Sequence, residues 1–321
     1  MNCILFDDYT RTNLLPLTYT RPVAELRFGA LTIREKWEAM LGTSSSSLTA
    51  SYLQKKFILK KQDENLLING SVCPNYELIA EITQLKMGEA LVKGDTVIAV
   101  VTNRSGIDKF NASDTKGFYS KTAASDFKKI NFLWDLFINN GRAIESDYKL
   151  LCRGKTSAPL NDTNHLIGNS IFIEEGASVE YATINTETGP VYIGKNAEIM
   201  EGCLIRGPFF LGENSVLKMG AKIYGPTTIG PYSKVGGEVN NCIFQGFSNK
   251  GHDGFLGNSI IGEWCNLGAN TNNSNLKNNY SEVSMWSYAS EKFENTGLQF
   301  CGFIMGDHSK CGITPCSTQG Q

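Results

Sequence analysis

Residues 193–240 read IGKNAE-IMEGCL-IRGPFF-LGENSV-LKMGAK-IYGPTT-IGPYSK-VGGEVN and decide the fold of the C-terminal half. An aliphatic residue opens each of these eight hexads, from Ile193 to Val235, and glycine follows it in four of them. Each hexad predicts a short strand whose aliphatic side chain points inward, then a turn in which glycine, asparagine or a small residue permits a positive φ. Three hexads close one coil of about 18 residues, and stacked coils bury their aliphatic residues in columns, so the pattern predicts a parallel β-helix.

The repeat extends beyond this stretch in both directions. Known hexapeptide β-helices coil left-handed, as an exception to the right-handed crossover rule, and resemblance to them implies a left-handed helix here. The spacing breaks after Val235 and again over residues 276–300, and such breaks are loops that either carry function or are merely tolerated. Further aliphatic residues in the same register stand at Ile167, Ile173, Val179, Ile184, Ile261 and Leu267.

Composition restricts the partners and the location of the protein. The length of 321 residues favours two domains, and the formal net charge of -2 argues against nucleic acid or an acidic membrane as a partner. No apolar run reaches the length of about 18 residues that predicts a membrane span, and the N-terminus lacks the features of a signal peptide. Nine cysteines without a CxxC pair fit a reducing compartment, and the histidines lack zinc-ligand spacing. We therefore expect a cytoplasmic protein in which Cys203, Cys242 and Cys265 serve as small core residues.

Patterns of strands and helices alternate in the first part of the chain. A short apolar strand is predicted at 3–6, and the apolar runs at 66–68 and 97–101 indicate buried parallel strands. Helical spacing marks 31–41 and 125–139, where a serine caps the second helix and an Asn-Asn-Gly sequence stops it. Alternation of this kind predicts an α/β domain.

Residues 14–24, LLPLTYTRPVA, resemble the "PLT…RP" segment that follows the phosphate loop of nucleotidyltransferases that make sugar nucleotides. The loop of that family is rich in glycine, so that backbone N–H groups approach the nucleotide phosphates. Here the preceding residues 7–13 read DDYTRTN and contain no glycine. The resemblance therefore implies weak nucleotide binding, with Arg11 and Arg21 holding the phosphates instead.

The same family places a magnesium-binding aspartate after a central strand, and this chain has Asn69 there. A neutral amide is a poor ligand for a hard cation, so no metal ligand is predicted and Mg²⁺ is kept only as a candidate cofactor of the first domain. Asp8 is expected to be a surface residue at a strand end, with a role as replacement ligand as the alternative.

Residues 248–275 read SNKGHDGFLGNSIIGEWCNLGANTNNSN. They resemble the acetyltransferase half of bifunctional N-acetylglucosamine-1-phosphate uridylyltransferase/glucosamine-1-phosphate acetyltransferase, which carries a "K-x-G-H-x-x-Y-L-G" segment and then an "N-I-G-A-G-T" segment. Acyl transfer from a coenzyme A thioester to an amine needs a base with a pKa near 7, and His252 suits that role. The resemblance further implies that Asn266 orients sugar hydroxyls and that the backbone N–H near Ala269 holds the acyl-CoA thioester or its oxyanion.

Other positions of this motif match the family less closely. Asn275 matches a further site residue, and Lys250 is displaced by one position from the family's lysine but remains a candidate contact for a substrate phosphate. Phe255 replaces a tyrosine in the substrate site and so lacks its hydroxyl. The two basic residues that hold the sugar phosphate in the family correspond to Gly225 and Cys242, so we expect a different acceptor.

Along its whole length the chain resembles the sugar nucleotidyltransferase-like group related to that bifunctional enzyme, in particular its glucose-1-phosphate thymidylyltransferase branch. The resemblance implies an α/β nucleotidyltransferase-like domain over 1–155 and a left-handed, acyltransferase-like β-helix over 156–321, assembled as a homotrimer. The leading interpretation is a sugar-phosphate or nucleotide-sugar transferase in which the β-helix transfers an acyl group from acetyl-CoA to an amino sugar. The alternatives are a nucleotidyltransferase with a structural β-helix and a catalytically silent sugar-nucleotide-binding scaffold.

Overall fold

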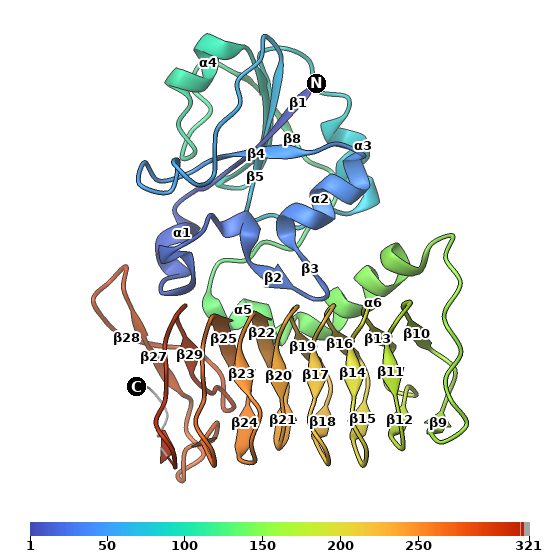
Figure 1. Ribbon diagram of the computed structural model, residues 1–321. Helices are drawn as coiled ribbons and strands as arrows, with labels where there is room; N and C mark the ends of the chain where they lie inside the picture. Colours follow the sequence, from blue (N-terminus) through green and yellow to red (C-terminus); the bar gives the residue numbers. More distant parts are fainter. Residues whose placement is uncertain (315, 318–321) are drawn as a thin grey trace. The chain divides into compact units, whose positions relative to one another are not determined.

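The computed structural model describes residues 1–314 and 316–317 of the chain. The described residues form two compact units (Figure 1). Unit 1 comprises residues 1–132 except 27–30, and unit 2 comprises those four residues with the chain from Leu133 onward. Unit 1 is an α/β structure and unit 2 contains a parallel β-solenoid, consistent with a left-handed β-helix, so the predicted fold class is confirmed.

The sheet of unit 1 is mixed and has the strand order β4-β1-β5-β7-β6-β8. β1 runs parallel to both β4 and β5, whereas β7 runs antiparallel to β5 and β6. The expected strands at 66–68 and 97–101 are both present. The expectation of parallel strands is confirmed for 66–68, which pairs parallel with β1, but is wrong for 97–101, because an apolar run reports burial and not direction. The strands are β1 (Asn2–Phe6), β4 (Ser45–Leu48), β5 (Asn65–Asn69), β6 (Glu89–Lys93), β7 (Thr96–Thr102) and β8 (Tyr119–Thr122).

Helix α2 (Ile33–Leu41) confirms the helical pattern predicted at 31–41. Thr32 accepts a hydrogen bond from the Glu35 backbone while the Glu35 side chain accepts one from the Thr32 backbone, which makes a capping box. Trp37 is fully buried and donates its indole N–H to the carbonyl of Val72 at 2.8 Å. The remaining short elements of this unit are α1 (Thr10–Asn13), the 3₁₀ helices Leu17–Tyr19 and Val23–Glu25, β3 (Leu31–Thr32), α3 (Tyr76–Ile82) and α4 (Arg104–Lys109).

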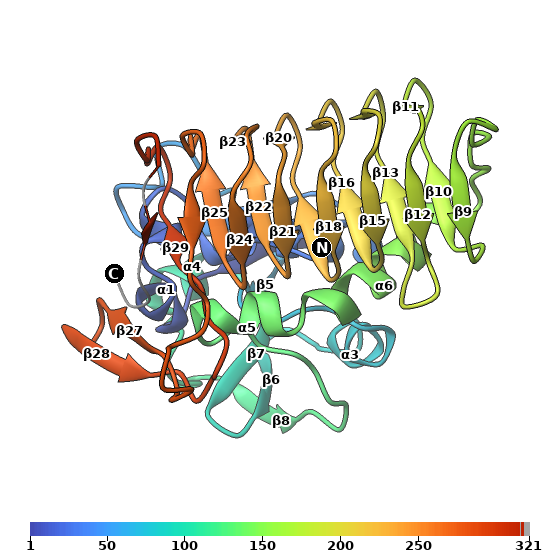
Figure 2. The ribbon, with the colours of Figure 1, turned by 90° about the horizontal axis from the view of Figure 1, so that it is seen from below.

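Three parallel sheets form the faces of the solenoid, which makes about six turns over residues 165–263. Its coils lie side by side in Figures 1 and 2. The first sheet contains β10 (Ile171–Ile173), β13 (Val191–Ile193), β16 (Phe209–Leu211), β19 (Thr227–Ile229), β22 (Ile243–Gly246), β25 (Ile260–Glu263) and β29 (Ile304–Met305). The second contains β11 (Ser178–Val179), β14 (Glu198–Ile199), β17 (Val216–Leu217), β20 (Lys234–Val235) and β23 (Asn249–Lys250). The third contains β9 (His165–Ile167), β12 (Thr183–Asn185), β15 (Leu204–Arg206), β18 (Lys222–Tyr224), β21 (Glu238–Asn240) and β24 (Phe255–Gly257).

The hexad aliphatics form the solenoid core, as the repeat predicts. Ile193, Leu211 and Ile229 occupy successive coils of the first sheet and are fully buried. Cys203 and Cys242 are buried in the same core, which confirms that they serve as small apolar residues. Beyond the regular coils, β26 (Asn272–Asn273) pairs with β30 (Cys316–Ser317), and the interruption at 276–300 contains an antiparallel hairpin of β27 (Ser284–Ser287) and β28 (Lys292–Asn295).

One row of corners departs from the expected turn chemistry. Asn196 and Asn214 take the left-handed backbone that the repeat predicts after the first sheet. Tyr232, Phe247 and Trp264 follow in the next coils with φ of 56°, 52° and 59°. Their rings are stacked, with centroids 5.2 and 4.9 Å apart. Stacking of about 0.5–1.5 kcal/mol per pair offsets the strain of an aromatic residue in this backbone region.

Two consecutive helices, α5 (Leu133–Ile138) and α6 (Asn140–Cys152), run along the first sheet of the solenoid (Figure 2). The single helix predicted at 125–139 therefore begins too early, whereas its predicted end agrees with the end of α5 at Ile138. Lys129 instead makes an antiparallel bridge with Val72. The Asn-Asn-Gly sequence ends α5, and a second helix that was not predicted, α6, begins directly at Asn140. The Asn140 amide oxygen accepts hydrogen bonds from the Gly29 backbone at 3.0 Å and from the Thr228 hydroxyl at 3.1 Å.

Candidate functional site

A cleft of about 430 Å³ opens in unit 1 where β1 and β4 end. These strands are parallel neighbours, so their carboxyl ends meet at one edge of the sheet. β5 lies on the other side of β1, so the chain reverses its winding direction there. Open α/β sheets bind ligands at such a reversal. The cleft is lined by Asp7, Asp8, Arg11, Thr12, Leu48, Thr49, Ala50, Phe110, Asn111 and Ala112.

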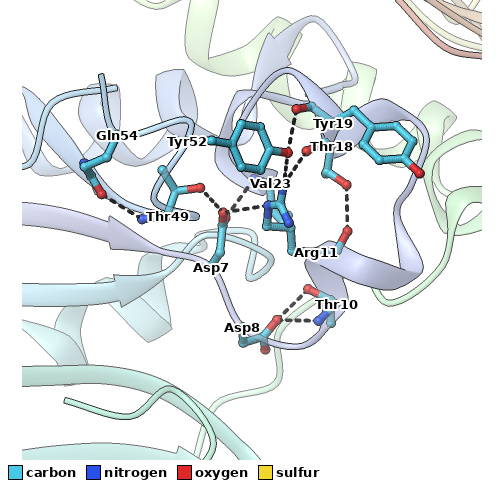
Figure 3. A network of polar contacts seen from close by, with 10 residues as sticks. All are labelled: Asp7, Asp8, Thr10, Arg11, Thr18, Tyr19, Val23, Thr49, Tyr52 and Gln54. Atoms are coloured by element: carbon cyan, nitrogen blue, oxygen red, sulfur yellow. Dashed lines mark hydrogen bonds and ion pairs between the residues drawn. The ribbon is translucent and has the colours of Figure 1, made fainter. Parts of the chain in front are cut away.

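Asp7 follows β1 directly and presents a buried carboxylate to this cleft (Figure 3). Its oxygens accept hydrogen bonds from the Thr49 hydroxyl and from the Val23 backbone N–H, the latter at 2.9 Å. Burial raises the pKa of Asp7 to about 6, although these hydrogen bonds and the charge of Arg11 oppose the increase. A carboxyl group in a cleft with a pKa displaced by burial is a feature of functional sites.

Arg11 lies beside Asp7 and lines the same cleft (Figure 3). Its guanidinium donates to the carbonyl of Thr18 at 2.9 Å and to the hydroxyl of Tyr52, whose ring centre lies 5.4 Å away. Its Nε is 3.7 Å from the Asp7 carboxylate and has no hydrogen-bond partner among the described residues. These contacts fix a planar cation at the cleft, where it suits the binding of phosphate oxygens.

Asp8 forms a buried ion pair with Lys129, whose ammonium lies 2.8 Å from the carboxylate. The Asp8 side chain is only 3% exposed, so the expectation of a surface residue is wrong. Burial alone would raise the pKa of Asp8, but hydrogen bonds from Lys129, Thr10 and Asn69 together lower it. The role of Lys129 could not be predicted from the sequence. The residues near it indicated a helix, and its partner Asp8 lies more than 100 positions earlier in the chain.

Asn69 occupies the position at which the resembling family carries its metal-binding aspartate. Its amide oxygen accepts hydrogen bonds from the backbone N–H and the hydroxyl of Ser71, and its amide nitrogen donates to Asp8. Both groups of the amide are thus engaged within the protein. Together with the ion pair of Asp8, this arrangement does not fit a divalent metal ion. No cluster of three or more acidic, histidine or cysteine side chains suited to a metal occurs among the described residues.

Arg21, the second predicted phosphate ligand, is buried at 6% exposure and is not one of the residues that line the cleft. The structure therefore brings only Arg11 of the predicted pair to the cleft. Asp7 and Thr49 also contribute there, and the sequence reasoning did not include them. The position of Asp7 at the end of an apolar strand was the signal that would have identified it.

Lys250 lies inside the solenoid rather than at its surface. It pairs with Val235 of the previous coil and so takes the inward position of an aliphatic residue. Its ammonium donates to the carbonyls of Gly236, His252 and Gly254 at 2.9, 3.1 and 2.9 Å. Burial lowers the pKa of Lys250 to about 8. Two of the three ammonium hydrogens serve the corner that follows β23 and the third serves the corner of the preceding coil, which leaves none for a substrate phosphate.

His252 is exposed at that corner, and its imidazole makes no hydrogen bond with any residue that the structure describes. Asn249 and Asn266 form a parallel bridge between neighbouring coils, and His252 and Ala269 each follow three residues later. His252 and Ala269 therefore occupy the same corner on successive coils. The motif thus brings the predicted base and the predicted acyl-CoA contact to one edge of the solenoid.

The other motif residues make contacts within the solenoid. The Asn266 side chain accepts a hydrogen bond from Asn249 at 2.9 Å, and Asn275 donates to Asn258 at 2.7 Å. Phe255 is half-buried in β24. A second hollow, of about 240 Å³, lies on the outer face of the third sheet and is lined by residues of β9, β12, β15 and β18. Neither this hollow nor the cleft of unit 1 is lined by any of these motif residues.

An α/β unit with a polar cleft at its strand ends, followed by a parallel β-solenoid, suggests a sugar-related transferase. Residues 3–156 match the family model described as sugar nucleotidyl transferase. This match extends over unit 1 and the helices α5 and α6, and it supports sugar phosphates or nucleotide sugars as partners. No curated protein matches the chain. None of the described helices has the length and apolar character needed to cross a membrane.

Proposed function

We propose that unit 1 transfers a nucleotidyl group to a sugar 1-phosphate in the cleft at the ends of β1 and β4. The observation that carries this proposal is the position of Arg11 in that cleft, within the segment that matches sugar nucleotidyl transferases. The guanidinium is already oriented by Thr18 and Tyr52, so little side-chain entropy is lost when it binds a phosphate.

The proposed chemistry needs charge stabilisation more than proton transfer. A phosphate oxygen of the sugar phosphate attacks the α-phosphorus of a nucleoside triphosphate, and the bond from that phosphorus to the pyrophosphate oxygen breaks. Pyrophosphate leaves with the bonding electrons, so no oxidant, reductant or general base is required. Arg11 would neutralise part of the phosphate charge, and the hydroxyl of Thr12 would donate a hydrogen bond to a phosphate or ribose oxygen.

Pyrophosphate release tests this function directly. The purified chain is incubated with each common nucleoside triphosphate and with glucose 1-phosphate or glucosamine 1-phosphate. We expect release with one pair, and a decrease of about tenfold or more in Arg11→Met, equivalent to about 1.4 kcal/mol of lost stabilisation. Arg104→Met is the matched control, because Arg104 is exposed on α4 of the same unit and does not line the cleft. Release that is equal in both variants would contradict the role of Arg11, and its absence with every pair would contradict the function.

Acyl transfer in unit 2 is the second candidate, and the observation that favours it is the free, exposed imidazole of His252 on the corner that also carries Ala269. In this reaction the amine of an amino sugar attacks the acetyl-CoA carbonyl, His252 accepts the amine proton, and the coenzyme A thiolate leaves. We expect thiol release from acetyl-CoA with an amino-sugar phosphate, lost in His252→Ala and retained in His165→Ala, which alters another exposed histidine. The homotrimer and the cytoplasmic location remain predictions.

A further inference from the structure

The carboxylate of Asp8 is saturated by donors from within unit 1. One oxygen accepts hydrogen bonds from the backbone N–H of Thr10 at 2.9 Å and from its hydroxyl at 2.5 Å. The other oxygen accepts from the Asn69 amide at 2.9 Å and lies 2.8 Å from the Lys129 ammonium. A carboxylate offers about four lone-pair directions, so these contacts use all of them.

The backbone around Lys129 is attached to the loop that follows β5. Lys129 bridges Val72, and the Ile130 N–H donates to the Ser71 carbonyl at 2.8 Å. On the other side, the Cys73 N–H donates to the carbonyl of Lys128 at 2.8 Å. The segment that supplies the ammonium is therefore held beside Asn69, the position at which the resembling family carries its metal-binding aspartate.

The ammonium has further partners that suit a cation. It lies 4.4 Å from the centre of the Tyr9 ring and 3.2 Å from the Tyr9 hydroxyl. The Lys129 side chain is only 7% exposed, so these protein groups and not water surround the ammonium. An aromatic face, a hydroxyl oxygen and a carboxylate together form a buried cation site that is filled by a side chain of the same unit.

We propose that Lys129 occupies, on Asp8, the place of a divalent metal ion, so that ligands bind in the cleft of unit 1 without a metal held by Asp8. Asp7, the other carboxylate of the cleft, is engaged by Thr49, Val23 and Arg11, so it offers no second ligand. Lys129 does not line the cleft itself, so it acts as a positioning residue that neutralises Asp8 and fixes its orientation. The proposal adds to the proposed function that Asp8 holds no metal ion during ligand binding. It rests on the proposed function only for the identity of the ligand.

Removal of the Lys129 ammonium by substitution tests whether Lys129 takes the place of a metal ion. In Lys129→Met the Asp8 carboxylate loses its countercharge while its surroundings remain, and an unpaired buried carboxylate has a strong demand for another cation. We therefore expect this variant to gain a site for Mn²⁺ that the native chain lacks. A merely structural role of Lys129 would lower stability but would not create a metal site.

Electron paramagnetic resonance of Mn²⁺ added to the full chain measures this gain, because binding reduces the signal of the free aquo ion. We expect weak or no binding by the native chain and by Lys128→Met, the exposed neighbouring control, and at least about tenfold tighter binding by Lys129→Met. Asp8→Asn combined with Lys129→Met removes both charges and should lose the gained site.

Tight Mn²⁺ binding by the native chain that Asp8→Asn abolishes would overturn the proposal, and this comparison does not depend on the folding of Lys129→Met. A folded Lys129→Met variant that gains no Mn²⁺ site would also overturn it. The experiment uses Mn²⁺ alone and no sugar or nucleotide. A failure here is therefore distinct from a failure of the pyrophosphate assay.

Discussion

The buried carboxyl group of Asp7 makes the stability of unit 1 depend on pH in a way that Asp7→Asn should remove. In the unfolded chain this group titrates near 3.8, whereas burial raises its pKa to about 6 in the folded protein. Between these values the folded state holds a proton that the unfolded state has lost. The contribution of Asp7 to the free energy of unfolding is therefore fully present below pH 3.8 and is lost as the pH rises through 6.

The magnitude follows from the size of the shift. An increase from 3.8 to about 6 is about two pKa units, and each unit corresponds to about 1.36 kcal/mol, so the total is about 3 kcal/mol. Asparagine does not titrate, and its changed hydrogen bonds add an offset that is the same at every pH. The free energy of unfolding of Asp7→Asn should thus increase by about 3 kcal/mol relative to the native chain between pH 3.8 and pH 6.

Urea unfolding at a series of pH values measures this difference. Trp37 reports on unit 1 when the other three tryptophans, at 134, 264 and 286, are replaced by phenylalanine. Asp126→Asn is the control, because the hydrogen bond from Lys93 lowers the pKa of Asp126 and so gives a dependence of the opposite sign. A difference between Asp7→Asn and the native chain that does not vary with pH would refute the reasoning.

Three further substitutions test the fold. Thr32→Ala removes the acceptor for the Glu35 backbone N–H, and we expect a loss of about 1 kcal/mol in the thermal unfolding of unit 1. Leu211→Ala leaves a cavity in the solenoid core and should lower the free energy of unfolding of unit 2 by about 2–5 kcal/mol in urea titrations. Burial lowers the pKa of Lys250 from 10.5 to about 8, so the unfolded chain binds more protons between these values. The native chain should therefore gain stability relative to Lys250→Met as the pH rises over that range, as measured by denaturant unfolding.

The solenoid could be predicted because its signal is repeated locally. Each coil buries its aliphatic residue against the next, so a period of six fixes both the strands and the core. The corners were less predictable, since glycine or asparagine is only the least strained choice for a left-handed backbone. At Tyr232, Phe247 and Trp264 the stacking between coils competes with that preference, and stacking depends on neighbours in space.

In unit 1 the elements were predictable but their relations were not. The apolar runs identified β5 and β7, whereas their antiparallel direction depends on the order of strands in the sheet. The amphipathic pattern at 125–139 was assigned to one helix, although the pairing of Lys129 with the loop after β5 prevents helix formation over its first half. Tertiary contacts override local preference in both cases.

Lys250 shows how register limits the interpretation of a motif. The match to a family sequence suggested a phosphate contact, but the role of a solenoid side chain depends on whether its position points inward. Leu217 pairs with Val235, and Val235 pairs with Lys250, so this coil is three residues shorter than the one before it. The shortening places Lys250 in the column of aliphatic residues, where its buried ammonium donates to backbone carbonyls of this corner and of the preceding coil. The contacts of Lys250 therefore describe how this corner is held in place, and the same lysine anchors the backbone of the exposed His252 through its carbonyl.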